Sequence, residues 1–336
     1  MIKRNLLYFG LIVLSLNACT KNDKANIDVS DIQLSIEIKR LDKDLFEIDP
    51  GNTEVELETI IKEYGEFFEI YNFRVINLSS QYNINYPEYL NGFITDYTMN
   101  SLYVKTSEVF PDLTELSDQM TEAFKYFKYY FPKKVVPEVF TYIGGFNQSI
   151  VVADSILAIG IDKYLGSDCE FYDRLGIANY LQLSMNPENI PADAMRAWAI
   201  TEFEYDNSID NLVNNIIHHG KILYFLDAVL PEYNDTLKIG FTDEEMKWCE
   251  SNDKQMWDYL IDNKLLFSTD YKVINQHISP APFTPGYPTD SPGRASVWLG
   301  WQIVRAYMQR NPKVTVSDLM YDSDYQKILS QSRYEP

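Results

Sequence analysis

Residues 139–159, VFTYIGGFNQSIVVADSILAI, decide the fold class. Residues 139–143, 150–152 and 156–159 are apolar except for Thr141, while Gly144-Gly145 and Asp154-Ser155 separate these runs. Short runs of this kind, bounded by Gly, Asp and Ser, are typical of strands joined by turns. We therefore expect a short antiparallel strand meander between residues 135 and 165.

The segment before this region combines a strand pattern with helical patterns. Apolar residues occupy every second position from Ile32 to Ile38, which predicts a first strand with one buried face. Between Thr53 and Tyr130 they recur at steps of three and four, most clearly from Leu113 to Phe127. We expect three or four helices there.

Helical patterns return beyond Pro187. We expect helices at 191–205, 208–229, 242–251, 254–263 and 292–310, the last with Ser291 as N-cap and Pro292 in the first helical position. The Pro-rich loop 279–290 before it either borders a cleft or is a plain connection. Because no linker or repeat interrupts residues 35–330, we predict one domain over 32–336, of the α+β class and predominantly helical.

Residues 1–19 have the order of a secretory leader that ends in a lipid-modified cysteine. Lys3 and Arg4 precede an apolar run that ends at Leu16, and Ala18 stands directly before Cys19. This order is typical of a signal peptide, and the run is shorter than the roughly 20 residues of a membrane-spanning helix. We expect cleavage after residue 18, membrane attachment through acyl chains on Cys19, and a flexible tether at 19–31. A secretory signal with a chance cysteine is the alternative.

The expected location is the cell envelope, where the lipid anchor holds the folded body on the periplasmic side of the inner or the outer membrane. The net charge of −20 disfavours nucleic acid as a partner. A hydrophobic fraction of 46% can fill a large core. Besides Cys19, the chain contains only Cys169 and Cys249, so at most one disulfide can form there, and two buried thiols are equally consistent with the sequence.

The histidines, His218, His219 and His277, form no known metal motif. The common helical zinc motif has two histidines four residues apart with a glutamate between them, whereas His218 and His219 are adjacent. Adjacent side chains on a helix point about 100° apart. The apolar line through Leu212 and Ile216 therefore places His219 inward and His218 on the polar side, and we favour a hydrogen-bonded core histidine over a ligand for His219.

Other residue patterns point to structural roles. We interpret Asp154 and Asp162, which flank the apolar stretch 156–161, as turn and cap residues rather than an acid/base pair. The aromatic residues at 126–130 have helical spacing, which indicates packing. Phosphate-binding loops and nucleophile motifs are absent from the sequence.

Three long segments and the leader resemble a known family. Residues 218–232, HHGKILYFLDAVLPE, together with 153–166 and 291–307, resemble the gliding-motility lipoprotein GldB of the Bacteroidetes. The likeness covers nearly the whole chain. It implies a component of the gliding machinery and of the linked type IX secretion system, with proteins of that machinery as partners.

The GldB family looks like a distant relative of predicted zinc-dependent proteases with a zincin-like fold. In those proteins, a helix with the two-histidine motif precedes a helix with an E-G pair whose glutamate is the third ligand. Here His219-Gly220 falls at the E-G pair, and 194–203, AMRAWAITEF, contains no histidine. The resemblance implies a degenerate zincin-like scaffold without a cofactor, and the candidate cleft residues are His218, His219, Lys221, His277, Arg294 and Trp298.

Three hypotheses for function follow. The first is a non-enzymatic scaffold or assembly factor for motility and secretion. The second is a divergent zinc-dependent peptidase that uses His219, His277 and a carboxylate as ligands. The third is a carbohydrate or peptidoglycan binder that uses some of the many tyrosines.

Overall fold

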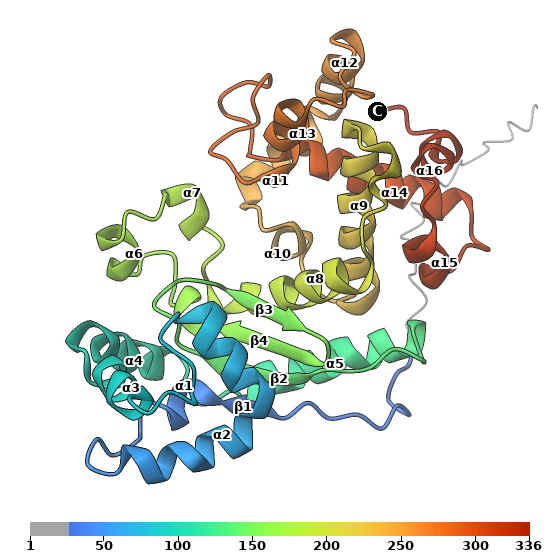
Figure 1. Ribbon diagram of the computed structural model, residues 1–336. Helices are drawn as coiled ribbons and strands as arrows, with labels where there is room; N and C mark the ends of the chain where they lie inside the picture. Colours follow the sequence, from blue (N-terminus) through green and yellow to red (C-terminus); the bar gives the residue numbers. More distant parts are fainter. Residues whose placement is uncertain (1–26) are drawn as a thin grey trace, which may run out of the picture.

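A computed structural model describes residues 27–336, so the leader and Cys19 lie outside the described residues. A four-stranded sheet forms the middle layer, with the strand order β1-β2-β4-β3. Its strands are β1 (Ile38–Arg40), β2 (Glu138–Tyr142), β3 (Ile150–Ala153) and β4 (Ile156–Gly160). Helices cover both faces of the sheet, and the second half of the chain adds a mostly helical part beside it (Figure 1).

Helices occupy most of the remaining chain. Before β2 lie α1 (Leu41–Asp44), α2 (Thr53–Ile70), the π-helical segment η1 (Tyr71–Val75), α3 (Tyr86–Thr95), α4 (Tyr97–Val109) and α5 (Thr114–Tyr130). After β4 lie η2 (Ile161–Lys163), α6 (Glu170–Arg174), α7 (Asn179–Gln182), η3 (Pro187–Asn189), α8 (Ile190–Glu202), η4 (Asn207–Ile209), α9 (Leu212–Val229), α10 (Asp235–Ile239), α11 (Asp243–Ser251), α12 (Asp253–Asp262), α13 (Tyr271–Ile278), α14 (Ala295–Arg310), α15 (Val316–Tyr321) and α16 (Tyr325–Ser332). The predominantly helical α+β class is confirmed.

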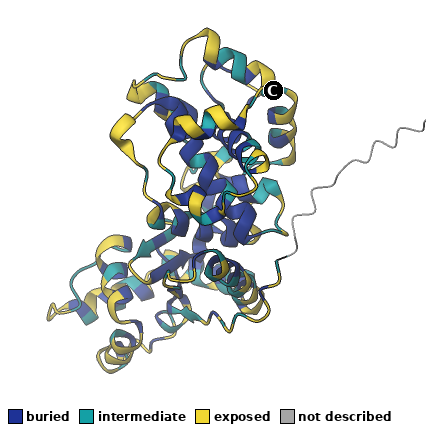
Figure 2. Cartoon of the chain, turned by 90° about the vertical axis from the view of Figure 1, so that its right-hand side faces the viewer, coloured by how far each residue is buried: buried dark blue, intermediate teal, exposed yellow. Residues whose placement is uncertain are grey.

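The two faces of the sheet pack against different helices because successive strand residues point in opposite directions. Phe140 and Ala158 join a buried cluster with α2 and α3. Val139 and Leu157 join a larger cluster with α5, α8 and α9. Buried residues run through both the sheet and the central helices, while exposed residues concentrate on the outer helices and loops (Figure 2).

The predicted antiparallel meander is wrong in its pairing. β3 and β4 form an antiparallel hairpin, but β4 pairs in parallel with β2, which in turn pairs in parallel with β1. The connection at 143–149 carries the chain past the position of β4, so β4 inserts between β2 and β3. The Asp162 carboxylate fixes this connection by accepting hydrogen bonds from the backbone N–H groups of Gly144 and Phe146, at 3.1 and 2.8 Å.

The helix-cap role predicted for Asp162 is wrong, because Asp162 lies inside η2 and its carboxylate binds the distant 143–149 connection instead of a helix end. Asp154 lies in the turn between β3 and β4 with a φ of 30°, so its predicted turn role is confirmed. Burial raises the pKa of the Asp162 carboxyl to about 6, and the two backbone donors oppose that shift.

The strand predicted from Ile32 is confined to its end, at Ile38–Arg40. Ile36 is buried, but its backbone binds side chains of α5 instead of a neighbouring strand. The Ile36 N–H donates to Thr121 Oγ1 at 2.9 Å, and the Ser117 hydroxyl donates to the Ile36 carbonyl. The alternating pattern therefore reports a buried extended segment rather than a long strand.

The helices α9 and α14 cross with their backbones in contact, and glycine permits this. A Cβ atom at Gly300 would lie 1.8 Å from the carbonyl oxygen of Ile216, and one at Gly220 would lie 2.3 Å from the Gly300 carbonyl. Such distances leave no room for a side chain. This crossing places the middle of α9, around Ile216 and Gly220, directly against α14 around Gly300.

The five helices predicted after Pro187 correspond to α8, α9, α11, α12 and α14, but the start of α14 was predicted too early. It begins at Ala295, after Arg294 with a φ of 52°, and Ser291 is not its N-cap. The Pro-rich loop occupies the preceding space: Thr284 donates to the Pro292 carbonyl at 2.7 Å and accepts from the Ala295 N–H at 2.8 Å. This loop is a packed connection that holds the start of α14.

Two further expectations concern the cysteines and the aromatic residues. Cys169 and Cys249 are both buried free thiols, which settles the alternative that the sequence left open. In α5, Phe127 and Tyr126 are buried, whereas Tyr129 is half exposed. Packing is therefore the role of the first two. Among residues 27–336, no helix is long and apolar enough to cross a membrane.

Candidate functional site

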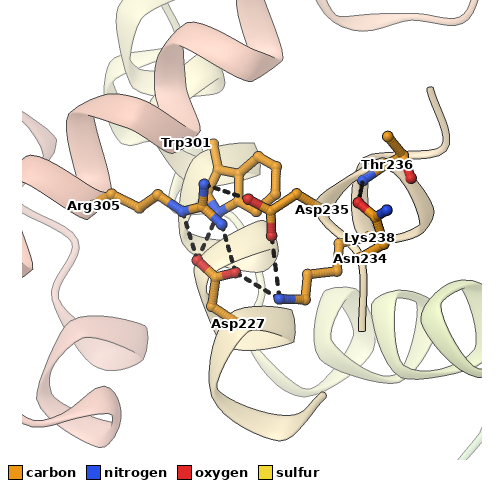
Figure 3. A network of polar contacts seen from close by, with 7 residues as sticks. All are labelled: Asp227, Asn234, Asp235, Thr236, Lys238, Trp301 and Arg305. Carbon is orange, nitrogen blue, oxygen red and sulfur yellow. Dashed lines mark hydrogen bonds and ion pairs between the residues drawn. The ribbon is translucent and has the colours of Figure 1, made fainter. Parts of the chain in front are cut away.

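A buried polar network ties α10 to α9 and α14 (Figure 3). We call it the Asp227 network, and it comprises Asp227, Asp235, Lys238, Trp301 and Arg305. Asp227 pairs with Arg305 at 2.7 Å and with Lys238 at 3.0 Å, and it accepts a hydrogen bond from Trp301 Nε1 at 3.0 Å. Asp235 pairs with the same two cations, at 2.8 and 3.3 Å. Because the side chains of Asp227 and Lys238 are almost fully buried, each charge depends on its partners.

Two arginines hold the C-terminal end of α10. Arg196 of α8 donates from Nη2 to the carbonyl oxygen of Lys238, and Arg294 donates from Nη2 to the carbonyl oxygen of Ile239. The last carbonyls of a helix lack helical partners and carry a partial negative charge, so cations stabilise them. Since the two acceptors are consecutive, the two guanidinium groups lie close together. We call Arg196 and Arg294 the guanidinium pair.

The two members of the guanidinium pair meet different carboxylates, and both Asp193 and Glu245 act electrostatically on Arg294. Arg196 pairs with Asp193 at 2.7 Å, and Asp193 also accepts from the Tyr164 hydroxyl at 3.0 Å. Arg294 makes no ion pair with any carboxylate in the described part of the chain; its guanidinium lies 5.8 Å from the centre of the Phe241 ring. Burial and the nearby Arg196 lower the pKa of Arg294 to about 10.

His219 lies beside the guanidinium pair. It is partly buried, and burial together with Arg294 and Arg196 lowers the pKa of its imidazole to about 4. The imidazole is therefore neutral at physiological pH and offers one N–H donor and one acceptor nitrogen. The inward orientation predicted for His219 is met only in part, because this residue is more exposed than His218. No hydrogen bond joins its ring to other residues of the described range 27–336. The hydrogen-bonded core histidine that we favoured is thus wrong.

A small cavity adjoins the guanidinium pair, and we call it the Ser184 pocket. It has a volume of about 190 Å³. Asp193, which binds Arg196, is part of its wall, and Ser184 lies next to Gly240, where Arg294 Nη2 also approaches. The lining residues are Ser149, Lys163, Tyr164, Ile177, Leu181, Ser184, Met185 and Asp193. The pocket therefore combines an apolar wall with polar groups.

His218 and Lys221 lie on a different side of α9. His218 is only 8% exposed, and its ring centre lies 5.1 Å from that of Tyr205. Lys221 is 3% exposed and donates from Nζ to the Asp322 carbonyl at 2.7 Å. Burial lowers the pKa of His218 to about 3 and that of Lys221 to about 8. His218 lies on the polar side of α9, as predicted, but α15 and α16 cover that side, so the ring is buried.

The remaining two candidates are core residues. The His277 ring is buried and its Nδ1 lies 2.8 Å from the Ser296 hydroxyl. Trp298 is 5% exposed and belongs to the larger hydrophobic cluster. The structure thus brings together His219 and Arg294, groups His218 with Lys221 elsewhere, and leaves His277 and Trp298 in structural positions.

A second, larger cavity is an acidic groove of about 670 Å³ between α5, η3 and the loop before α10. Apolar residues such as Leu113 and Leu116 line it together with four carboxylates, those of Asp112, Glu115, Glu188 and Glu232. Its charge is opposite to that of the guanidinium pair. We refer to it as the acidic groove.

Sequence reasoning missed Arg196, Asp193, Tyr164 and Asp227. A usable signal existed for two of them, because Arg196 and Asp227 each interrupt an otherwise apolar helical run. A charge in such a run is buried and paired when the helix is central. Asp193 and Tyr164 had no comparable signal, since their contact joins segments 29 residues apart.

Within residues 27–336, no group of three or more His, Cys, Asp and Glu side chains is arranged to hold a metal ion. No curated protein and no solved structure matches the chain. A sequence model of the family described as gliding motility protein GldB matches residues 22–336. Since the match covers nearly the whole chain, this protein belongs to the GldB family of gliding motility proteins.

Proposed function

We propose that this protein is a non-enzymatic, lipid-anchored scaffold or assembly factor of the gliding machinery and of the type IX secretion system linked to it. Family membership gives it a role in gliding motility. What we propose beyond this is the molecular role as a scaffold, the attachment through Cys19 and the position on the periplasmic side of the envelope.

The observation that carries the proposal is the guanidinium pair beside His219. His219 stands where the resemblance to zinc proteases places the third metal ligand, and α8, the helix before it, contributes Arg196 instead of histidines. Two unit charges about 4 Å apart interact by roughly 4 kcal/mol at an effective dielectric constant of about 20. A zinc ion carries two unit charges, so each guanidinium group at such a distance would repel it by roughly twice that energy, whereas anionic groups would be attracted.

Site-specific photo-crosslinking of the full-length protein in gliding cells tests the scaffold role. We would place the crosslinker at Leu181, in the wall of the Ser184 pocket, and at Glu115, in the acidic groove. Exposed Arg310, far along α14, is the matched control. We expect a discrete adduct with a motility or secretion protein from at least one cavity position and none from Arg310. Equal labelling of abundant lipoproteins from all three positions would contradict the proposal.

Zinc analysis separates the scaffold from a peptidase. The full-length protein, purified without chelators, should contain far less than one zinc per chain, and His219→Ala should not change that value. Stoichiometric zinc that is lost in His219→Ala, together with cleavage of peptides, would replace the scaffold with the enzyme.

The lipid anchor is tested by Cys19→Ala, with Cys169→Ala as the control, because Cys169 is a buried thiol of the folded body. We expect Cys19→Ala to lose acylation and to leave the membrane fraction, while Cys169→Ala sediments with membranes. Membrane sedimentation of unacylated Cys19→Ala would show that the anchor is wrongly assigned.

A further inference from the structure

The acidic groove carries negative charge that the described part of the chain does not balance. Among residues 27–336, none that lines the groove is basic. In the same range, none of its four carboxylates makes an ion pair. A cavity lined by one sign of charge concentrates the field of that charge and attracts molecules of the opposite sign. The groove is therefore suited to a ligand with positive charge.

The carboxylates of the groove belong to separate segments of the chain. Asp112 and Glu115 lie at the start of α5, Glu188 lies in η3, and Glu232 lies in the loop before α10. The negative charges are thus distributed over different walls of the groove. Several separate positive charges on one ligand complement such a distribution better than a single charge does.

Apolar side chains form much of the remaining wall. Phe110, Leu113 and Ile190 are buried, whereas Val109 and Leu237 are only half-buried. A half-buried apolar side chain still exposes apolar surface, and a ligand that covers this surface gains free energy. A purely polar cation leaves the surface uncovered. A polypeptide segment with basic and apolar side chains matches both parts of the groove.

Tyr233 contributes an unpaired hydroxyl to the wall of the groove. This hydroxyl is buried, and it has no hydrogen-bond partner in the described part of the chain. Burial, together with Glu115 and Glu122, raises the pKa of Tyr233 to about 12. The hydroxyl therefore keeps its proton at physiological pH and remains a donor. Buried hydroxyls normally have a partner, and a backbone carbonyl of a bound segment would supply one.

We propose that the acidic groove binds a segment of a partner protein in which lysine or arginine alternates with apolar side chains. The carboxylates pair with the basic side chains, the apolar side chains cover Val109 and Leu237, and Tyr233 donates to the backbone of the segment. A second copy of this chain is a poor occupant, because its net charge of −20 opposes self-association. The inference rests on the proposed scaffold role and specifies the chemistry of the partner.

Calorimetric titration of the full-length protein in a neutral detergent tests the groove. The probes are a short acetylated and amidated peptide of lysine and leucine, the same peptide with glutamate for lysine, the same peptide with serine for leucine, and spermine. We expect the lysine-leucine peptide to bind, the glutamate peptide not to bind, and the serine peptide and spermine to bind at least about tenfold more weakly. Addition of about 0.5 M NaCl should weaken the binding, because salt screens exposed charges.

Variants assign the binding to the groove. Glu115→Gln combined with Glu232→Gln removes two charges from the groove and should weaken binding of the lysine-leucine peptide about tenfold or more. Glu58→Gln combined with Glu66→Gln removes the same charge from exposed positions of α2, on the other face of the sheet, and should not. Leu237→Asn changes no charge and should weaken binding of the lysine-leucine peptide but not of the serine peptide.

Several results would overturn the proposal once circular dichroism has shown that each variant is folded. They are binding of the glutamate peptide, binding of spermine as tight as that of the lysine-leucine peptide, and equal losses in the two double variants. The scaffold role is judged separately. A crosslinked adduct from Leu181 without peptide binding would contradict the groove alone, whereas peptide binding without any adduct in cells would contradict the scaffold role.

Discussion

Two adjacent histidines of α9 have opposite surroundings. His218 packs against the rings of Tyr205 and Tyr325 beside the buried Lys221, whereas His219 lies beside Arg196 and Arg294. The rings diverge because adjacent residues are about 100° apart around a helix. The helix α9 is buried on nearly every side, so most of its polar residues contact other elements rather than water.

The substitution with the largest expected effect disrupts the crossing of α9 and α14, on which the surroundings of both histidines depend. In Gly300→Ala, the added methyl group would collide with the Ile216 carbonyl and separate α14 from α9. We expect a loss of roughly 3 kcal/mol or more of unfolding free energy, or no folded protein. Gly92→Ala in α3 is the control, because nothing lies within 4 Å of the added atom. Urea unfolding that shows equal stability for the two variants would refute the close crossing.

The next effect concerns the Asp227 network, which places α10 on the His219 side of α9. In Asp227→Asn, buried Lys238 and half-buried Arg305 lose the more buried of their two shared carboxylates and keep only Asp235. We expect a loss of roughly 3 to 5 kcal/mol in the unfolding free energy. Asp258→Asn, which disrupts a surface pair with Lys254, should change it by less than about 1 kcal/mol. Similar losses in both variants would mean that the network does not hold α10.

Acid should destabilise the protein through both histidines. An unfolded histidine has its ordinary pKa of 6.5, and burial lowers the pKa of His218 to about 3 and that of His219 to about 4. Protons therefore bind the unfolded chain first, and stability falls as the pH drops below about 7. Each histidine contributes a loss of roughly 2 kcal/mol at about pH 5. The raised pKa of Asp162 acts in the opposite direction, because its protonated form favours the folded state.

Single substitutions separate these contributions. His218→Phe, which keeps a ring between Tyr205 and Tyr325, should reduce the loss of unfolding free energy between about pH 7 and pH 5 by roughly 2 kcal/mol. Chemical denaturation at both pH values measures it. Asp162→Asn should increase the loss, since it removes the opposing group. An unchanged pH dependence in His218→Phe would mean that the imidazole is not kept neutral by burial.

The smallest expected effect is a change in the pKa of His219 that leaves the pKa of His218 unchanged. Arg294→Gln removes one of the charges that lower the pKa of His219, so that pKa should rise toward its ordinary value. The pKa of His218 should stay the same, because burial, His219 and Lys221 lower it and Arg294 does not. Proton NMR titration of the two imidazoles measures both values, with Arg310→Gln as the control. Parallel shifts of both rings would indicate a general loosening of α9 instead.

Part of the fold and of the site could be predicted from the sequence. The periodicity of 113–127 and of 208–229 predicted α5 and α9. The apolar line on α9 did not predict which of the two adjacent histidines is more buried, because the structure buries His218 more than His219. The sequence named His219 and Arg294 among six candidate cleft residues, but it did not predict that Arg196 and the end of α10 would lie beside them. The helices α15 and α16 have six and eight residues, which is too short for a clear periodic signal, so the burial of His218 escaped prediction.

The sequence alone determined the local elements, because turn residues and apolar spacing act over a few positions of the chain. Only the tertiary structure decided the strand order β1-β2-β4-β3, the start of α14 after Arg294, and the meeting of Arg196 with Arg294 at α10. These features depend on contacts between residues distant in sequence, such as Arg196 with the Lys238 carbonyl. A pattern along the chain does not specify which distant carbonyl a guanidinium will bind.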